Sequence, residues 1–328
     1  MYKQPSRNGS SAQIINKMKD LSNVSAVAID TASDGQRVDN FLMRLCKGVP
    51  RSHIYRILRT GEVRVNSRRV DATYRLKSGD TVRIPPVRLA QRGHKRRVPP
   101  ALLPVVYQDP SLLVVDKPAG TAVHGGSGVS FGVIEQLRAA QPEQKFLELV
   151  HRLDRETSGL LAIAKKRSAL TGLHAALREG RVRKDYLVLV KGRWPKEPQR
   201  VRLPLKKFLT RSGERRVSVD REGRDSETVF RRKQVFRDYT LVSAELLTGR
   251  THQIRVQLAH LGFPIAGDNK YGEIELNRSL AKQGLRRMFL HAAVLEFEHP
   301  LTGDSLKLTS PLPPELATFL RSLAAERP

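Results

Sequence analysis

The first part of the chain combines two kinds of apolar spacing. Apolar side chains in residues 38–45 fall three and four positions apart, which predicts an amphipathic helix. The same spacing predicts a second helix over 51–60, ended by Gly61 in the position that glycine favours after a helix. Apolar residues at alternate positions then predict short strands at 63–65 and 81–84. Together these elements predict a small helix-helix-strand module.

From residue 101 onward, strand-like runs predominate over helical patterns. Strands are predicted at 105–107, 112–116, 147–150, 160–165, 186–191, 216–219, 228–236, 240–247, 289–297 and 306–309. Helices are predicted at 130–140, 168–179, 251–261 and 314–325. Because the strands come in runs with few helices between them, the pattern favours an α+β fold with a largely antiparallel sheet over a doubly wound fold.

Composition divides the 328-residue chain into four segments, with room for a small and a large domain. Residues 1–33 are rich in Ser, Asn and Lys with scattered apolar positions, which predicts a mostly disordered arm. The small module occupies residues 35–87. Residues 88–100 hold Gly, Pro and many basic side chains, and are predicted to be a basic linker. The larger domain is predicted to span residues 101–328.

Positive charge is the strongest feature of the composition. The chain has 59 Lys and Arg against 32 Asp and Glu, a formal net charge of +27. Residues 36–97 alone hold 17 basic and 4 acidic side chains, a net charge of +13. This excess of positive charge favours a polyanionic partner over a charged surface that is only solvated. Nucleic acid is favoured over a membrane, because no apolar run approaches the ~20 residues that would span one. The candidate RNA contacts in the module are Arg51, Arg56, Arg59, Arg64, Arg68 and Arg69.

Other sequence features narrow the class of protein. Cys46 is the single cysteine, which excludes an internal disulfide or a zinc ribbon and favours a cytoplasmic protein. Its place in the helical pattern predicts a buried packing role. Residues 1–30 lack the order of a secretory signal. The chain has no Walker loop, no Gly-x-Gly-x-x-Gly after a strand and no clustered His or Cys, so neither a cofactor nor a metal is predicted.

The segment 151–159, His-Arg-Leu-Asp-Arg-Glu-Thr-Ser-Gly, is the most informative motif. It holds Asp154 between Arg152 and Arg155, and it follows an apolar strand-like run at 146–150. A side chain at the junction of a strand and a loop projects from a rigid base, so Asp154 is a candidate nucleophile. A surface salt bridge at a strand end is the alternative interpretation.

Two other kinds of site can be drawn from the same residues. Ser158, His151 and Asp154 could form a hydrolase triad, but no nucleophile elbow surrounds the serine. His151, Asp154, His252 and Asp268 could bind a metal, but they lack ligand spacing on any one element. Both alternatives are disfavoured.

The motif at 151–159 resembles the active-site motif of the RluA-type family of RNA pseudouridine synthases. Segments 114–120, 184–190 and 248–255 resemble three further motifs of that family, in the family's order. The segment 124–128, His-Gly-Gly-Ser-Gly, resembles members that act on large-subunit ribosomal RNA. The resemblance covers roughly residues 35 to 320, and in addition the small module resembles the S4 RNA-binding domain.

The resemblance implies a role for four residues. Asp154 corresponds to the catalytic residue, and Arg255 to the arginine that pairs with it; the apolar stripe of helix 251–261 would place Arg255 at its edge. Tyr186 would stack on the target uracil. Arg152 could occupy the space that a flipped base leaves. The reaction is an isomerisation and needs no cofactor.

The resemblance also implies partners. The expected substrate is 23S ribosomal RNA or a precursor of the large subunit, with no membrane and no required protein partner, and the expected state is a monomer. The alternative is a non-catalytic RNA-binding factor for ribosome assembly on the same fold. The presence of Asp154, Tyr186 and Arg255 together disfavours that alternative, because a pure RNA-binding protein has no need of the carboxylate.

Overall fold

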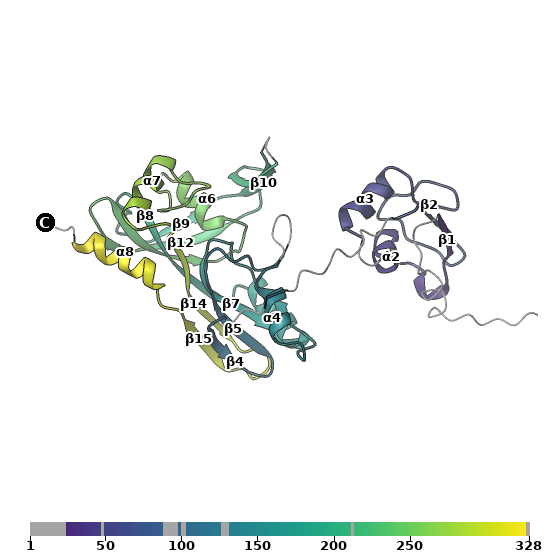
Figure 1. Cartoon of the computed structure of the whole chain (residues 1–328), viewed down its shortest axis with the longest axis horizontal. Helices are drawn as coiled ribbons and strands as arrows, with labels where there is room; N and C mark the ends of the chain where they lie inside the picture. The colour runs from purple at the N-terminus through teal and green to yellow at the C-terminus, as the bar shows by residue number, and fades with distance from the viewer. Residues whose placement is uncertain are drawn as a thin grey trace, which may run out of the picture. The chain divides into compact units, whose positions relative to one another are not determined.

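The chain divides into two compact units, residues 1–97 and residues 98–328 (Figure 1). The structure, a computed structural model, describes residues 24–46, 49–87, 98–99, 103–125, 131–210 and 213–325. Within these ranges no helix is both long enough and apolar enough to cross a lipid bilayer.

The N-terminal unit packs two helices on a small sheet. The elements are β1 (Ser25–Ala28), a 3-10 helix η1 (Thr31–Ser33), α2 (Val38–Leu45), α3 (Arg51–Arg59), β2 (Arg64–Val65) and β3 (Thr81–Ile84). The strands are antiparallel in the order β1-β3-β2. Both predicted helices are present, and Gly61 follows α3 with a φ of 73°, the left-handed conformation that favours glycine there. Cys46 is buried in the core of this unit, as predicted.

The predicted disordered arm of residues 1–33 is wrong at its C-terminal end. Residues Ser25–Ala28 form β1 and pair with β3. Val27 and Ile29 are buried, so this segment contributes two side chains to the core of the unit. A four-residue strand in a polar segment has too few alternating positions to stand out in the sequence. Residues 1–23 and most of the predicted linker 88–100 lie outside the described residues.

The C-terminal unit is built on a ten-stranded sheet in the order β4-β5-β7-β14-β8-β13-β12-β9, with β15 on β14 and β6 on β7. Its strands are β4 (Val105–Gln108), β5 (Leu112–Lys117), β6 (Glu148–Leu149), β7 (Ser158–Ala164), β8 (Arg183–Lys191), β9 (Gln199–Arg202), β12 (Glu227–Val235), β13 (Tyr239–Leu246), β14 (Leu290–Glu298) and β15 (Ser305–Thr309). A separate hairpin is formed by β10 (Leu205–Leu209) and β11 (Arg215–Val219). The helices are α4 (Val133–Ala140), α5 (Arg167–Arg178), α6 (Gln253–His260), α7 (Ile274–Lys282) and α8 (Pro314–Ala325).

The sheet is antiparallel at every described strand pair except one, β7 with β14, which is parallel. The α+β fold with a largely antiparallel sheet is therefore confirmed. Strands β9 and β10 and helix α7 were not predicted. In Figure 1, α6 and α7 lie at the end of the unit that holds β8, β9 and β12, away from β4 and β15.

Strand β5 shows how the sheet separates two apolar layers. Leu113 and Val115 belong to one buried cluster, together with side chains of α4. Leu112 and Val114 point to the other face and join a cluster with side chains of α5. Because both faces are covered, the middle of the sheet is a rigid base for the loops at its ends.

Gly159 is required where β7 approaches β14. Its φ is 111°, and a Cβ atom there would lie 2.3 Å from the backbone oxygen of Ala292. Ala292 pairs with Gly159 in the parallel register of the two strands. A side chain at position 159 would therefore separate the two strands just after the segment that carries Asp154.

We expect Gly159→Ala to destabilise the C-terminal unit by about 2–4 kcal/mol, because overpacking adds to backbone strain. The chain has one tryptophan, Trp194, buried in this unit, so its fluorescence during urea unfolding reports on this unit. Gly180→Ala is the matched control: its φ is 72°, but a Cβ would meet nothing within 4 Å. The control should cost only about 1 kcal/mol. Equal losses in the two variants would contradict the steric argument.

Candidate active site

The loop that carries Asp154 runs through residues 150–157, between β6 and β7. Leu153 is buried beneath it, and the backbone oxygen of Asp154 accepts a hydrogen bond from the Thr157 amide at 3.2 Å. These contacts turn the chain so that the Asp154 side chain, 23% exposed, borders a cavity. The strand-to-loop junction predicted from the sequence is therefore present.

Lys117, at the end of β5, fixes this loop from inside. Its side chain is fully buried, and its Nζ donates to the backbone oxygens of Pro118, Thr121 and Arg155 at 2.8, 2.8 and 3.2 Å. Burial, and then the charge of Arg287, lower the pKa of Lys117 to about 7. The contact with the Arg155 carbonyl ties the residue after Asp154 to the sheet.

The start of α6 is held by the buried amide side chain of Gln253. Gln253 donates to the backbone oxygen of Glu227 at 2.9 Å and to the Thr228 hydroxyl at 2.9 Å. Its own amide oxygen accepts from the Thr248 hydroxyl at 2.8 Å and from the Arg250 backbone amide at 2.9 Å. This network attaches the start of α6 to β12, so residues on the first turn of α6 have fixed positions.

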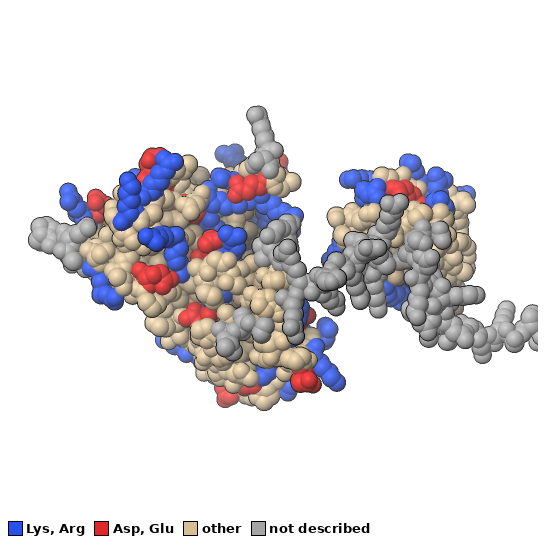
Figure 2. All heavy atoms as spheres, in the orientation of Figure 1, with Lys and Arg blue, Asp and Glu red and all other residues tan. Residues whose placement is uncertain are grey.

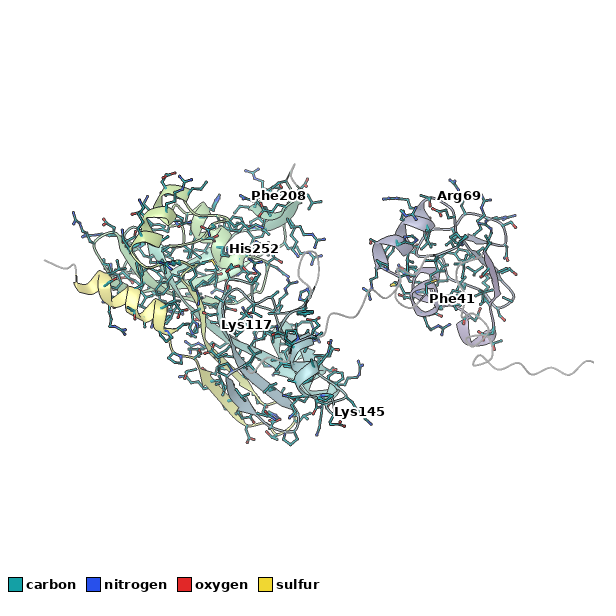
Figure 3. All side chains as sticks on the ribbon, viewed as in Figure 1. Phe41, Arg69, Lys117, Lys145, Phe208 and His252 are labelled. Carbon is teal, nitrogen blue, oxygen red and sulfur yellow. The ribbon has the colours of Figure 1, made fainter. Side chains whose placement is uncertain are left out.

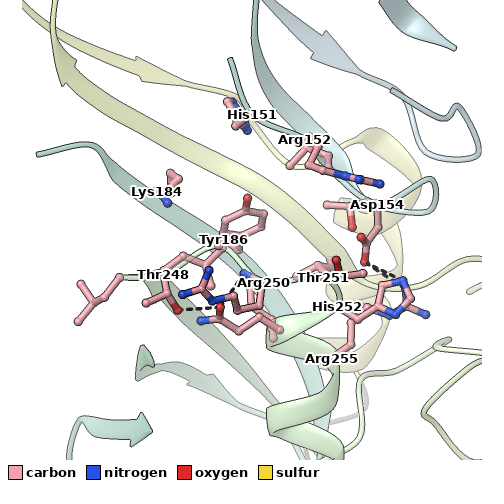
Figure 4. A pocket seen from close by; sticks show the side chains of 18 of the residues that line it. His151, Arg152, Asp154, Lys184, Tyr186, Thr248, Arg250, Thr251, His252 and Arg255 are labelled. Atoms are coloured by element: carbon pink, nitrogen blue, oxygen red, sulfur yellow. Dashed lines mark hydrogen bonds and ion pairs between the residues drawn. The ribbon is translucent and has the colours of Figure 1, made fainter. Parts of the chain in front are cut away.

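Arg255 connects two carboxylates at the centre of the site. Its Nη1 lies 3.1 Å from Oδ2 of Asp154, and Figure 4 shows this contact. On the other side, its Nε and Nη2 donate to the two oxygens of Asp268, both at 2.8 Å. Asp268 also accepts from the backbone amides of Lys270 and Tyr271. The two-point contact sets the plane of the guanidinium, which in turn sets the position of Asp154.

The charges of this array stabilise one another despite burial. The Arg255 side chain is 7% exposed and that of Asp268 is 1% exposed. Burial alone lowers the pKa of Arg255, but its hydrogen bonds and proximity to Asp268, then to Asp154, raise it overall. Burial alone raises the pKa of Asp268, and the contacts with Arg255 lower it overall. The expected place of Arg255 at the edge of an apolar stripe is wrong: residues 253–258 of α6 are buried on all sides.

His252 and Tyr271 border the same array. The Tyr271 ring lies 5.1 Å from the guanidinium carbon of Arg255, a cation-π distance. Its hydroxyl is 2.7 Å from Nδ1 of His252. Nε2 of His252 lies 3.9 Å from Oδ2 of Asp154. Two aromatic side chains thus flank the ion pair between Asp154 and Arg255.

Tyr186 forms part of the wall of the cavity that Asp154 borders. This cavity has a volume of about 730 Å³ and is also lined by His151, Arg152 and Lys184 (Figure 4). Tyr186 is 6% exposed, and burial followed by the charge of Asp154 raises the pKa of its hydroxyl. Burial, then the charge of Lys184, lowers the pKa of His151 to about 4. Near neutral pH both Tyr186 and His151 are therefore uncharged.

A second cavity, of about 1120 Å³, also borders Asp154, and seven Lys and Arg side chains line it together with four Asp and Glu side chains. Arg152, which is exposed, lines both cavities. The other basic side chains that line the second cavity are Arg155, Arg215, Arg255, Lys270, Arg286 and Arg287. Asp154 thus lies between a smaller cavity walled by Tyr186 and a larger one that suits an anionic chain.

The structure brings Asp154, Arg255, Tyr186 and Arg152 to one place, as the sequence predicted. The six arginines proposed as RNA contacts lie in the N-terminal unit, and all are exposed. The sequence did not identify Asp268 or His252 as parts of this site, except in a disfavoured metal set. The segment 267–272, Gly-Asp-Asn-Lys-Tyr-Gly, is a turn-rich signal next to α6 in sequence that could have pointed to Asp268.

The two disfavoured sites do not form. Ser158 bonds to Nδ1 of His291 at 2.9 Å, whereas His151 accepts from the Ala162 amide at 3.1 Å. A hydrolase triad with Asp154 is therefore not assembled. In the described ranges no group of His, Cys, Asp or Glu side chains could hold a metal ion. Instead the guanidinium of Arg255 occupies the space between Asp154 and Asp268.

Both units match known families of proteins. Residues 111–260 match the family model described as RNA pseudouridylate synthase, and residues 36–82 match the S4 domain model. The chain is 52% identical over 311 residues to ribosomal large subunit pseudouridine synthase C of Salmonella typhi, which covers 92% of this chain and 98% of that protein. The protein of the same name from Escherichia coli (strain K12) is 52% identical over 312 residues, with 93% and 98% covered.

A solved structure also has a fold similar to that of this chain. Human RNA Pseudouridylate Synthase Domain Containing 1 aligns with a TM-score of 0.54 and 25% sequence identity. The alignment covers 68% of this chain and 95% of the human one.

We expect Asp268→Asn to lower the free energy of unfolding at pH 7 by about 3 kcal/mol. This is the low end of the range for breaking a buried ion pair, because Arg255 keeps Asp154 as a second partner. The pKa of Asp268 is lowered in the folded state, so its stabilisation is complete above the unfolded value of about 4 and is lost as the pH falls through the folded value. The difference between variant and wild type should therefore shrink below about pH 4.

The measurement is urea unfolding followed by Trp194 fluorescence between pH 3 and 7. Glu275→Gln is the control: it breaks the Glu275–Arg278 pair at 2.6 Å, whose side chains are 81% and 69% exposed. An exposed pair contributes at most about 1 kcal/mol. A loss for Asp268→Asn as small as that of the control would mean that the Arg255 array does not stabilise the fold.

Proposed function

The chain belongs to the RNA pseudouridylate synthase family, and we propose that it isomerises specific uridines of 23S ribosomal RNA with Asp154 as its catalytic residue. The relatives from Salmonella typhi and Escherichia coli are named for the large ribosomal subunit and cover this chain almost completely. The observation that supports Asp154 most directly is its contact with Arg255, itself fixed by Asp268, at the border of two cavities.

The reaction places clear demands on the site. The bond from uracil N1 to ribose C1′ must break, the detached base must turn, and a bond from C5 to C1′ must form. The hydrogen on C5 leaves as a proton and N1 gains one, so atoms and electrons balance within the substrate and water. The protein must supply a nucleophile or charge stabiliser, hold the base while it turns, and accept a uridine extracted from its stack.

Asp154 meets the first demand through one of its two oxygens. Oδ2 is occupied by Arg255 at 3.1 Å. Oδ1 accepts no hydrogen bond from any described residue, so it is the oxygen that remains available to react. The guanidinium keeps the carboxylate in one orientation, which lowers the cost of reaching the transition state.

Tyr186 meets the second demand. Its buried ring forms part of the wall of the 730 Å³ cavity, a volume within the range of small-molecule sites. Because burial raises the pKa of its hydroxyl, the side chain stays neutral and can stack on a uracil or donate a hydrogen bond to it. Arg152, exposed at the border of both cavities, can occupy the place that the flipped base vacates.

Binding of the RNA backbone is assigned to basic surface. Figure 2 shows Lys and Arg side chains spread over the visible face of both units, with patches of Asp and Glu between them. In the S4 domain, Arg51, Arg59 and Arg68 are exposed. We propose that this domain binds ribosomal RNA phosphates, which would raise the local concentration of substrate at Asp154.

We also propose a cellular location and an oligomeric state for the enzyme. We propose that the protein acts in the cytoplasm, where a bacterium makes its ribosomal RNA. The contacts among Asp154, Arg255 and Asp268 form within a single chain. We propose that the protein is a monomer with no required protein partner.

We expect Asp154→Asn to lower pseudouridine formation at least about 10³-fold, because the amide keeps the shape but lacks the charge and nucleophilicity. RNA affinity should stay within about threefold or rise slightly, since a negative charge facing phosphates is removed. Release of tritium from carbon 5 of labelled uridine in 23S RNA measures the reaction. Asp304→Asn, an exposed turn residue, should be fully active. Substantial activity of Asp154→Asn in purified protein would refute the assignment.

We expect the triple variant Arg51→Gln, Arg59→Gln and Arg68→Gln to bind 23S RNA more weakly and with a flatter dependence on salt. Each phosphate that an arginine no longer neutralises should reduce the slope of log affinity against log salt by about 0.7 for single-stranded RNA. The saturated rate should change little.

The control for this variant is the neutralisation of Arg278, Lys282 and Arg321 to Gln. These side chains are exposed on α7 and α8 and border neither cavity of the site. The measurement is a titration of both triple variants with 23S RNA at several salt concentrations. Equal slopes for the two would mean that the S4 arginines have no special role.

A further inference from the structure

His252 has an unusual backbone conformation. It is the residue just before α6, with φ 55° and ψ 21°, in the left-handed region that a histidine seldom adopts. Only two other non-glycine residues of the described chain, Asn66 and Ser67, have positive φ, and both lie in the N-terminal unit. A strained residue next to a reactive group is a sign of function. In Figure 4 the His252 side chain lies beside Asp154 and Arg255.

The hydrogen bonds of Tyr271 favour one tautomer of His252. The Tyr271 hydroxyl accepts from the backbone amide of Val217 at 3.0 Å. Its own hydrogen then needs an acceptor, and Nδ1 of His252 lies 2.7 Å away. Among the described residues the hydroxyl makes no hydrogen bond besides these two. This arrangement favours Nδ1 as the acceptor, which places the proton of the neutral imidazole on Nε2.

The protonated nitrogen faces the catalytic carboxylate. Nε2 of His252 lies 3.9 Å from Oδ2 of Asp154, the same oxygen that Arg255 contacts. This distance is too long for a hydrogen bond. Hydrogen bonds at catalytic groups are often long without substrate and shorten when it binds. A movement of about 1 Å would give Oδ2 a second donor.

We propose that His252 is a positioning residue for Asp154, whose Nε2–H holds Oδ2 together with Arg255 when RNA is bound, so that Oδ1 alone reacts. This role rests on the proposed function of Asp154. With the proton on Nε2, this nitrogen cannot act as a general base. Tyr271 contributes by fixing the tautomer.

The surroundings keep the imidazole neutral. Burial lowers the pKa of His252 to about 4, with the charges of Arg255 and Lys270 acting in the same direction and those of Asp154 and Asp268 opposing them. A neutral donor orients the carboxylate without neutralising it, whereas an imidazolium would compete for its negative charge.

The tautomer of His252 also depends on the hairpin of β10 and β11. Val217, which anchors the Tyr271 hydroxyl, lies on β11, in the hairpin that Figure 3 marks by Phe208. Val217 and Tyr271 pack in one apolar cluster with Val256 of α6. The tautomer is thus set by a contact between two separate elements of the fold.

The first test compares His252→Asn with His252→Gln in the full-length protein. Asn tolerates the left-handed conformation but its amide reaches only the position of Nδ1, whereas the Gln amide reaches that of Nε2. We expect kcat of the Asn variant on 23S RNA to fall about 10- to 100-fold with RNA affinity within about twofold, and the Gln variant to regain a large part of that loss. His260→Asn, at the end of α6 and outside both cavities, is the control and should match wild type.

The second test reads the tautomer directly. Nitrogen-15 NMR of histidine-labelled wild-type protein should show His252 protonated at Nε2, and Tyr271→Phe should produce a mixture of tautomers. Because Tyr271→Phe removes the bond that favours the neutral ring, the pKa of His252 should rise and the acidic limb of the kcat profile should move to higher pH. The wild-type spectrum tests the tautomer of His252 even if a His252 variant does not fold.

Three results would overturn the proposal: protonation at Nδ1, an Asn variant with kcat within about twofold of wild type, or equal losses in the Asn and Gln variants. The proposed function is tested by a different variant, because an active Asp154→Asn protein would refute it. An inactive Asp154→Asn with a fully active His252→Asn would leave the function intact and remove only the positioning role.

Discussion

The site depends on one buried guanidinium. Arg255 is held at two points by Asp268 and presents its remaining nitrogen to Asp154. Burying a positive charge is costly unless it is paired, and the two carboxylates together offset that cost for Arg255. The same contacts that offset the burial of Arg255 also orient Asp154. The stability of the array and the orientation of Asp154 therefore have one physical origin.

The sheet makes this array possible by bringing distant segments together. Asp154 and Arg255 are separated by 101 residues in the chain. The loop of Asp154 is fixed by Lys117 at the end of β5 and by the close approach of Gly159 to β14. Arg255 is fixed by the amide network that joins α6 to β12. Each partner is thus positioned by a different part of the sheet, and a rigid sheet keeps the 3.1 Å contact between them.

The sequence predicted the elements that have a clear apolar period, and it missed those that do not. Strands β9 and β10 are rich in basic side chains and largely exposed, and α7 buries only Asn277 and Leu280, so no period distinguishes them. Asp154, Arg255 and Tyr186 could be identified because they lie in motifs. The pairing of Asp268 with Arg255 and the contact of His252 with Tyr271 could not be read from the sequence, because both depend on how a turn meets α6 in three dimensions.

The order of the strands has a consequence for the newly made protein. Strand β14 lies between β7 and β8 in the sheet, yet it is synthesised about a hundred residues after them. Until Leu290–Glu298 leave the ribosome, β7 and β8 have no common neighbour and Gly159 has no partner strand. The C-terminal unit therefore cannot complete its fold step by step during translation. A nascent chain that already contains Asp154, Arg255 and Asp268 therefore still lacks the strand that joins β7 to β8.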